Sequence, residues 1–143
     1  MKKIVTLLMS LAFFATIANA DDRPIDYEQL PSAAKSFIEA DFPMQTISYI
    51  TKDMDLLDTA YNVHFANGLE IEFNSKGEWK EIKCKTSSVP ANLVPNKIMY
   101  QIKKRYPTQK IIGIETGREG YEVKLSSGLE IKFNRKFQVV EID

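Results

Sequence analysis

Two stretches of the chain alternate strictly between apolar and polar residues. Outside their turns, the odd-numbered positions of residues 61–73 are apolar, and the odd-numbered positions of residues 121–133 repeat the pattern. Because successive side chains of a strand point to opposite faces, each stretch predicts two strands with one buried face and one solvent face. A glycine interrupts each stretch, Gly68 in the first and Gly128 in the second, and indicates the turn of a β-hairpin.

The alternation also predicts the register of each hairpin. Opposed residues share a face, so Phe65 must pair with Leu69, which leaves a three-residue loop with Gly68 in the left-handed conformation. A two-residue loop would instead place Phe65 opposite Glu70 and bury a carboxylate. In the second hairpin the same register places two complementary charge pairs on the outer face, Lys124 with Glu130 and Glu122 with Lys132.

These hairpins belong to a longer internal repeat. Residues 61–74 match residues 121–134 at an offset of 60, and residues 31–50 match residues 95–114 at an offset of 64. The change of offset is an insertion in one loop, where insertions cost little. The sequence therefore predicts five segments: a signal peptide over 1–20, a lead-in over 21–29, a first unit over 30–83, a linker over 84–93 and a second unit over 94–143.

Each unit is expected to begin with a helix, from Leu30 to Pro43 and from Pro95 to Pro107, since proline is tolerated in a first turn and ends a helix later. Four strands should follow each helix: 46–52, 60–65, 69–73 and 79–83, then 110–116, 121–125, 129–133 and 138–142. A sheet with one apolar face must bury that face against another layer of structure, which the two helices can supply. We therefore predict an α+β fold of two tandem α-β-β-β-β repeats, with the helices on one face of an antiparallel sheet and the other face open to water.

The N-terminus has the pattern of an export signal. Lys2 and Lys3 precede an apolar run, and Ala18 and Ala20 supply small residues at the −3 and −1 positions. This pattern predicts cleavage after Ala20 and a periplasmic protein, and the run is too short to favour stable membrane insertion.

Composition and charge narrow the function classes. The 143 residues carry 19 basic and 19 acidic side chains, and removal of residues 1–20 leaves 17 basic and 19 acidic ones, a net charge of −2. That balance argues against nucleic acid as a partner.

Cys84 is the single cysteine, so no intramolecular disulfide is available. Three roles are open to it: a buried small hydrophobe, an intermolecular bridge or a reactive thiol.

No catalytic motif or cofactor fingerprint is present, so we expect neither an enzyme nor a bound cofactor. The single histidine, His64, is predicted to lie opposite Glu70 and beside Glu72, a set that could bind a metal or a small ligand. Residues 53–58 alternate acids but lack the glycine and the terminal glutamate of a calcium loop.

The fourth strand carries the single tryptophan. If Ile82 faces the helices, Trp79 and Glu81 turn outward unless a bulge intervenes, and an outward tryptophan is a candidate interface anchor. The residues expected to form a protein-binding surface on the open face are Trp79, Glu81, His64, Glu70, Glu72, Lys124 and Lys132.

The repeated motif Leu-Pro…Phe-Pro…Tyr-x-Val…Gly-Leu-Glu-Ile-x-Phe-Asn…Trp-Lys-Glu-Ile behind a signal peptide resembles the beta-lactamase-inhibitor-like, PepSY-like family of small periplasmic proteins from Bacteroides-type bacteria. The resemblance covers nearly all of residues 27–143. It implies a duplicated unit of a helix and an antiparallel sheet, as in the beta-lactamase inhibitor protein, in which the open face of the sheet grips an enzyme.

We therefore expect a non-catalytic exported module that binds or inhibits another exported protein, such as a peptidase or a cell-wall enzyme, through the open face of its sheet. The alternative is a periplasmic protein that binds a small ligand or a metal through His64, Glu70 and Glu72.

Overall fold

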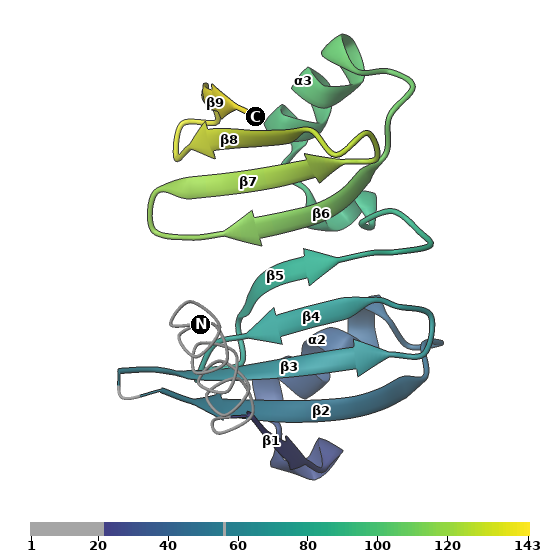
Figure 1. Ribbon diagram of the computed structural model, residues 1–143, viewed down its shortest axis with the longest axis vertical. Helices are drawn as coiled ribbons and strands as arrows, with labels where there is room; N and C mark the ends of the chain where they lie inside the picture. The colour runs from purple at the N-terminus through teal and green to yellow at the C-terminus, as the bar shows by residue number, and fades with distance from the viewer. Residues whose placement is uncertain (1–21, 56) are drawn as a thin grey trace, which may run out of the picture.

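The computed structural model describes residues 22–55 and 57–143. Nine strands form one antiparallel sheet in which the spatial order follows the chain order, from β1 at one edge to β9 at the other (Figure 1). The strands are β1 (Asp22–Ile25), β2 (Ile47–Met54), β3 (Thr59–Phe65), β4 (Glu70–Phe73), β5 (Trp79–Lys83), β6 (Ile111–Thr116), β7 (Gly120–Leu125), β8 (Glu130–Asn134) and β9 (Val139–Ile142). The predicted α+β class and the antiparallel sheet are confirmed.

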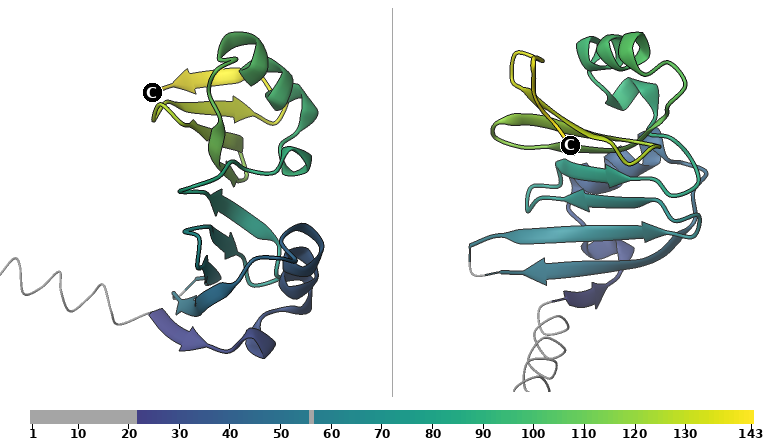
Figure 2. Two further views of the ribbon diagram at one scale, coloured as in Figure 1. Left: turned by 90° about the vertical axis from the view of Figure 1, so that its right-hand side faces the viewer. Right: turned by 45° about the horizontal axis from the view of Figure 1, so that its top comes forward.

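Two ten-residue helices, α2 (Ser32–Asp41) and α3 (Asn96–Arg105), cover one face of this sheet, as Figure 2 shows. Each starts directly after a proline and ends just before the aromatic residue that precedes the next proline. Short 3-10 turns precede them, η1 (Tyr27–Gln29) and η2 (Ala91–Leu93). Both helices bury one apolar stripe against the sheet: Ala34 and Ile38 from α2, Ile98 and Ile102 from α3.

The two predicted hairpin registers are confirmed. Val63 pairs with Ile71, and Val123 pairs with Ile131. Gly68 and Gly128 have φ values of 88° and 95°, the left-handed conformation that the three-residue loops require. The apolar residues of both hairpins therefore form the floor of the core, and their polar neighbours face water.

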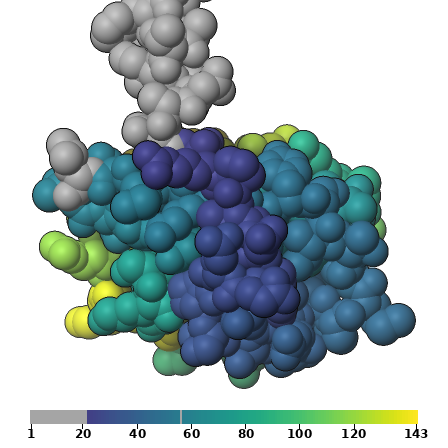
Figure 3. Space-filling view, turned by 90° about the horizontal axis from the view of Figure 1, so that it is seen from below, coloured from purple at the N-terminus to yellow at the C-terminus, as the bar shows by residue number. Residues whose placement is uncertain are grey.

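The lead-in over residues 21–29 is not a structureless approach to the first helix. Residues 22–25 form β1, which pairs with β2 at the edge of the sheet, and Ile25 lies opposite Ile50. Figure 3 shows this purple segment lying across the surface at that end of the molecule. The strand is four residues long and contains Pro24, which is tolerated at a sheet edge, so its sequence carries no alternation long enough to predict it.

The two halves of the chain join through β5 and β6. Ile82 lies opposite Ile114 in this pairing, and Glu81 lies opposite Glu115. Beyond β5, the backbone N–H of Cys84 donates to the carbonyl oxygen of Ile112 at 2.7 Å. This register makes one continuous core under both helices.

A β-bulge corrects the expected direction of Trp79. Glu72 pairs with Glu81 but Phe73 pairs with Trp79, so Lys80 is an extra residue in β5. The extra residue returns Trp79 to the helix side, where its ring lies 6.5 Å from the ring of Phe37. Trp79 is therefore part of the core margin and not an outward anchor.

The predicted signal peptide lies outside the described residues. Among residues 22–55 and 57–143, no helix is long and apolar enough to cross a membrane.

Candidate functional site

A row of four glutamates crosses the middle of the open face. Glu72, Glu81, Glu115 and Glu122 lie directly opposite one another on the adjacent strands β4, β5, β6 and β7. We call these four residues the glutamate row. Like charges in directly opposed positions of a sheet repel one another, so the row opposes the pairing of the strands that carry it.

The electrostatics of the glutamate row reflect this crowding. Burial is the main cause that raises the pKa of Glu72, of Glu81 and of Glu122, and the carboxylate of Glu115 adds to the rise in all three. Burial and like charge both disfavour the ionised form. The row therefore holds negative charge at a free-energy cost that a cation placed on it would reduce.

At one end of the glutamate row lies the cluster expected around His64. The Nδ1 atom of His64 lies 3.0 Å from Oε1 of Glu70, and the ring of Tyr49 stacks on the imidazole with centroids 4.2 Å apart. Glu72 follows on the same face, opposite Asn62. No group of three or more His, Cys, Asp or Glu side chains among the described residues is arranged to hold a metal ion.

Lysines flank the glutamate row without neutralising it. Lys124 approaches Glu130 to 3.9 Å, as the hairpin register predicted, and Lys83 approaches Glu81 to 3.7 Å. Glu122 and Lys132 also lie directly opposite each other, as the register predicted, but the ion pair that Lys132 forms is with Glu141 on β9, at 2.5 Å. Strand β9 brings this carboxylate alongside β8, and Glu122 is left within the row.

The open face therefore brings together six of the seven predicted binding residues: Glu81, His64, Glu70, Glu72, Lys124 and Lys132. Trp79 lies on the other side. Sequence reasoning missed Glu115, and it treated Glu122 as half of a salt bridge. Alternation alone indicates that both side chains face outward, but the partner of β6 had to be known before the row could be recognised.

The face is hollowed where the two halves meet. A depression of about 460 Å³ is lined by residues of β4 to β8, including Glu81, Glu115 and Glu122 of the row. A smaller one of about 180 Å³ adjoins it over His64, Glu70 and Glu72. Both are shallow, which suits contact with a protruding side chain or an ion.

Cys84 is buried, with 6% of its surface exposed. Burial raises the pKa of its thiol, so the nucleophilic thiolate is disfavoured at neutral pH. Of the three roles considered from the sequence, the structure places Cys84 as a small hydrophobe of the core.

The fold and the open face together define a class of protein: a nine-stranded antiparallel sheet that is covered on one side by two helices (Figure 2) and carries charged side chains on the other. Residues 59–141 match the family described as "Putative beta-lactamase-inhibitor-like, PepSY-like". The chain belongs to this PepSY-like family, as its repeated motif indicated.

Solved structures of similar proteins come from Bacteroides. A periplasmic protein of the DUF2874 family from Bacteroides vulgatus is 42% identical over 87% of this chain and 98% of its own, with a TM-score of 0.83. A protein from Bacteroides thetaiotaomicron, described as a "putative calcium-regulated periplasmic protein", is 38% identical over 85% and 96% of the two chains, also with a TM-score of 0.83. A second Bacteroides vulgatus protein, periplasmic and of unknown function, is 40% identical over 85% and 98%, with a TM-score of 0.82. No curated protein sequence matches this chain.

Proposed function

We propose that this protein is an exported, non-catalytic module that binds a basic surface of another exported protein through the glutamate row. The observation that carries the proposal is the row itself, four glutamates in directly opposed positions on an open sheet face. Local arrangements of side chains that reduce the stability of the fold are expected at functional sites.

The chemistry of the partner follows from the charge and shape of the face. Three of the four carboxyl groups have raised pKa values, so a Lys or Arg side chain would relieve repulsion as well as form an ion pair. The depression of about 460 Å³ over the row can receive such a side chain. A peptidase or a cell-wall enzyme with a basic rim around its own site fits this description.

Export and internal duplication are part of the same proposal. The relatives described as periplasmic support removal of residues 1–20 and a mature chain that begins at Asp21. We take residues 30–83 and 94–143 as two copies of one α-β-β-β-β unit, with residues 21–29 as the lead-in and 84–93 as the linker. N-terminal sequencing of protein from the periplasmic fraction tests the cleavage, and material that begins at Met1 would contradict it.

Capture from a Bacteroides periplasmic extract tests the binding face. The immobilised wild-type protein is compared with a Glu81→Gln/Glu115→Gln variant and with a control, Glu78→Gln/Glu119→Gln, that loses the same charge away from the row. We expect a basic protein that the wild type and the control retain, that the row variant loses, and that salt elutes. A partner that all three retain equally would refute the role of the row.

A divalent cation is the second candidate, because the Bacteroides thetaiotaomicron relative is described as calcium-regulated. Ca²⁺ prefers carboxylate oxygens, which the glutamate row supplies, while a nitrogen-binding metal such as zinc would use His64 with Glu70 and Glu72. Either ion would require these side chains to converge further than they do.

Calorimetric titration separates the two ions. Calcium heat that is abolished in the Glu81→Gln/Glu115→Gln variant would assign the ion to the row, and zinc heat that is abolished in His64→Ala would assign it to the histidine end. If neither titration produces heat, the cation candidate is excluded and the protein-binding proposal stands alone.

A further inference from the structure

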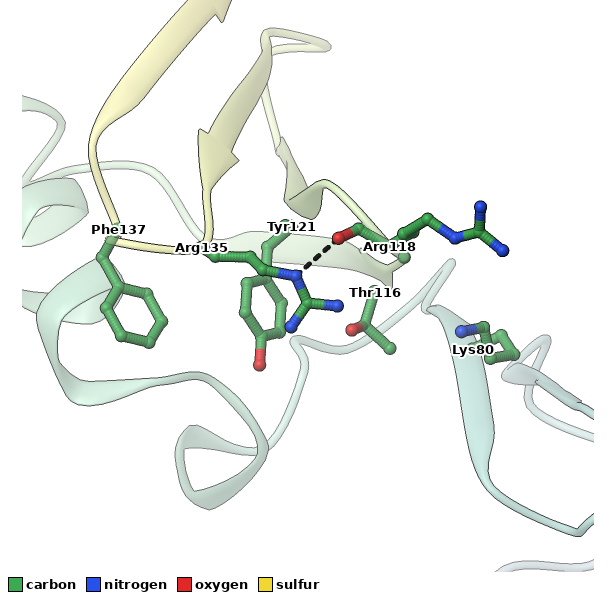
Figure 4. A pocket seen from close by; sticks show the side chains of 8 residues that line it. Lys80, Thr116, Arg118, Tyr121, Arg135 and Phe137 are labelled. Carbon is green, nitrogen blue, oxygen red and sulfur yellow. Dashed lines mark hydrogen bonds between the residues drawn. The ribbon is translucent and has the colours of Figure 1, made fainter.

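The helix side of the sheet carries a further hollow, which is lined by basic residues, whereas the glutamate row is acidic. It has a volume of about 550 Å³ and lies at the strand ends where β5 meets the second half of the chain. Its lining residues come from β5, from the end of β6, the start of β7 and the turn between them, and from the turn that follows β8 (Figure 4). The residues that line it are Lys80, Thr116, Gly117, Arg118, Gly120, Tyr121, Arg135 and Phe137.

Three cations and no carboxylate line this hollow. Among the described residues, Lys80, Arg118 and Arg135 are absent from every ion pair within 4.0 Å. The nearby acids lie elsewhere: Glu119 lines an adjoining depression, and Glu72 interacts electrostatically with Lys80 from the glutamate row. The hollow thus gathers three positive charges, none of which has a carboxylate within 4.0 Å among the described residues.

Two of the three cations point into the hollow, and Arg118 contributes mainly its backbone. The Nε–H of Arg135 donates to the backbone carbonyl oxygen of Arg118 at 2.5 Å, which ties the two turns together. This bond positions Arg135 through its Nε atom, and its terminal amino groups have no hydrogen-bond acceptor among residues 22–55 and 57–143. Figure 4 shows Arg135 and Lys80 entering the hollow from opposite sides.

An aromatic wall completes the hollow. The rings of Tyr121 and Phe137 stack with centroids 5.9 Å apart and an interplanar angle of 23°. Phe137 is held at φ 62°, and it is the single non-glycine residue with positive φ among residues 22–55 and 57–143. A strained backbone that presents an aromatic ring to a hollow is a sign of function, because a glycine would satisfy the turn more easily.

We propose that this hollow binds a small ligand that carries an oxyanion, a carboxylate or a phosphate, next to a planar apolar group. The guanidinium of Arg135 and the amine of Lys80 pair with the oxyanion, since arginine matches the planar geometry of such groups and lysine adds a point charge. Tyr121 and Phe137 contact the planar part of the ligand. No residue of the glutamate row lines this hollow, although Lys80 interacts electrostatically with Glu72 of the row.

Binding is measured by NMR titration with four probes: inorganic phosphate, phenyl phosphate, acetate and benzoate. We expect the amide signals of Gly117 and Gly120 to move, and the two aromatic probes to bind at least fivefold more tightly than their inorganic or aliphatic counterparts. The stronger of phenyl phosphate and benzoate identifies the natural oxyanion.

Four variants make the assignment specific. Lys80→Gln and Arg135→Gln should each weaken the aromatic probes about tenfold, the loss expected for one charge-assisted hydrogen bond. The matched controls Lys76→Gln and Arg105→Gln remove the same charges outside the hollow and should change nothing. Phe137→Gly keeps the turn and should remove only the preference for aromatic probes.

The proposal fails if none of the four probes moves these signals at millimolar concentration. It also fails if the Lys76 and Arg105 controls weaken binding as much as the Lys80 and Arg135 variants do. Equal affinity of Phe137→Gly and the wild type for phenyl phosphate would remove the aromatic wall from the site. Each outcome leaves the capture experiment on the glutamate row unaffected.

Discussion

Two turns of the sheet, residues 74–78 after β4 and residues 134–138 after β8, have the same hydrogen bonds and opposite surroundings. In the first, Asn74 Oδ1 accepts from the backbone N–H groups of Lys76 and Glu78, both at 3.0 Å. In the second, Asn134 Oδ1 accepts from Lys136 and Gln138, again both at 3.0 Å. The fourth residue of each turn has positive φ, 85° at Gly77 and 62° at Phe137.

The difference lies in what the fourth residue allows the helix to do. At Gly77 a Cβ atom would lie 2.8 Å from the backbone nitrogen of Ala34 and 2.9 Å from Cβ of Pro31, so the start of α2 rests directly on the turn. At Phe137 the ring stacks on Tyr121, and two residues of α3 reach the turn: Gln101 Nε2 donates to the Phe137 carbonyl oxygen at 2.8 Å, and Lys97 Nζ lies 5.9 Å from the centroid of the ring. The two turns thus differ in what lies at their fourth residue, the start of a helix at Gly77 and an aromatic ring beside a hollow at Phe137.

The largest expected effect follows from closing the first turn with a side chain. Gly77→Ala should lower the free energy of unfolding by about 2–4 kcal/mol, because the added methyl group would lie 2.8 Å from the backbone nitrogen of Ala34 and because alanine disfavours the left-handed backbone conformation at this position. Chemical denaturation measures the loss. Gly128→Ala is the matched control, since its φ is also positive but nothing lies within 4 Å of the added Cβ, and it should cost about 1 kcal/mol. Equal losses would show that α2 does not rest on the turn as described.

The equivalence of the two turns can be tested at their asparagines. Asn74→Ala and Asn134→Ala each remove an amide oxygen that accepts from two backbone N–H groups, at an expected cost of about 1–2 kcal/mol. Thermal unfolding of both variants checks this. Costs that differ by more than about 1 kcal/mol would show that the two turns contribute unequally despite the same bonds.

The strain at Phe137 can be separated from the loss of its ring. Phe137→Ala and Phe137→Gly both remove the aromatic contacts, but glycine tolerates positive φ, so the glycine variant should be more stable by about 1 kcal/mol. Denaturation of the two proteins side by side measures the difference. An alanine variant as stable as the glycine variant would indicate that the backbone relaxes and holds no strain.

The smallest effect on stability is expected from a substitution in the glutamate row, which spans the two halves of the chain. Glu81→Gln should raise the free energy of unfolding near pH 7 by about 0.2–1 kcal/mol, because Glu81 is opposed by Glu72 and by Glu115. Glu119→Gln, in the exposed β6–β7 turn, is the control and should change the stability little.

The pH dependence of that gain has a definite sign. Burial raises the pKa of Glu81 in the folded protein above its ordinary value of 4.5, so the folded state takes up the proton first as the pH falls. The repulsion is complete above the raised pKa and disappears below 4.5, and the advantage of Glu81→Gln should disappear with it. A gain that is independent of pH would contradict the electrostatic account.

Sequence reasoning succeeded where one physical constraint allowed a single answer. Apolar parity in residues 61–73 and 121–133 left one hairpin register each, and Gly68 and Gly128 supplied the conformation that it required. The helix ends were predicted to within a few residues because prolines delimit them. The outer-face positions of His64, Glu70 and Glu72 followed from the same register.

Sequence reasoning failed where the direction of a side chain depends on one extra residue in a strand, or where a site depends on strands that are distant in the sequence. The extra residue Lys80 reverses the direction of Trp79, and nothing in the local pattern distinguishes a bulged strand from a regular one. The glutamate row depends on the pairing of β5 with β6, which are separated in the chain by residues 84–110, including α3. Similarly, the three cations of the second hollow come from separate turns, so no spacing in the sequence connects them.

Strand order that copies chain order has a consequence for how the molecule assembles. Most neighbouring strands are joined by turns of a few residues, and only the β1–β2 and β5–β6 pairings enclose a helix. Closing short loops costs little chain entropy, and the contacts within each hairpin are local in the sequence. We therefore expect the hairpins of each half to form early in folding. The β5–β6 pairing must close a loop of residues 84–110. We therefore expect the pairing of the two halves to form last. A chain that leaves a translocation pore with its N-terminus first could therefore complete β1 to β5 before the second half has emerged.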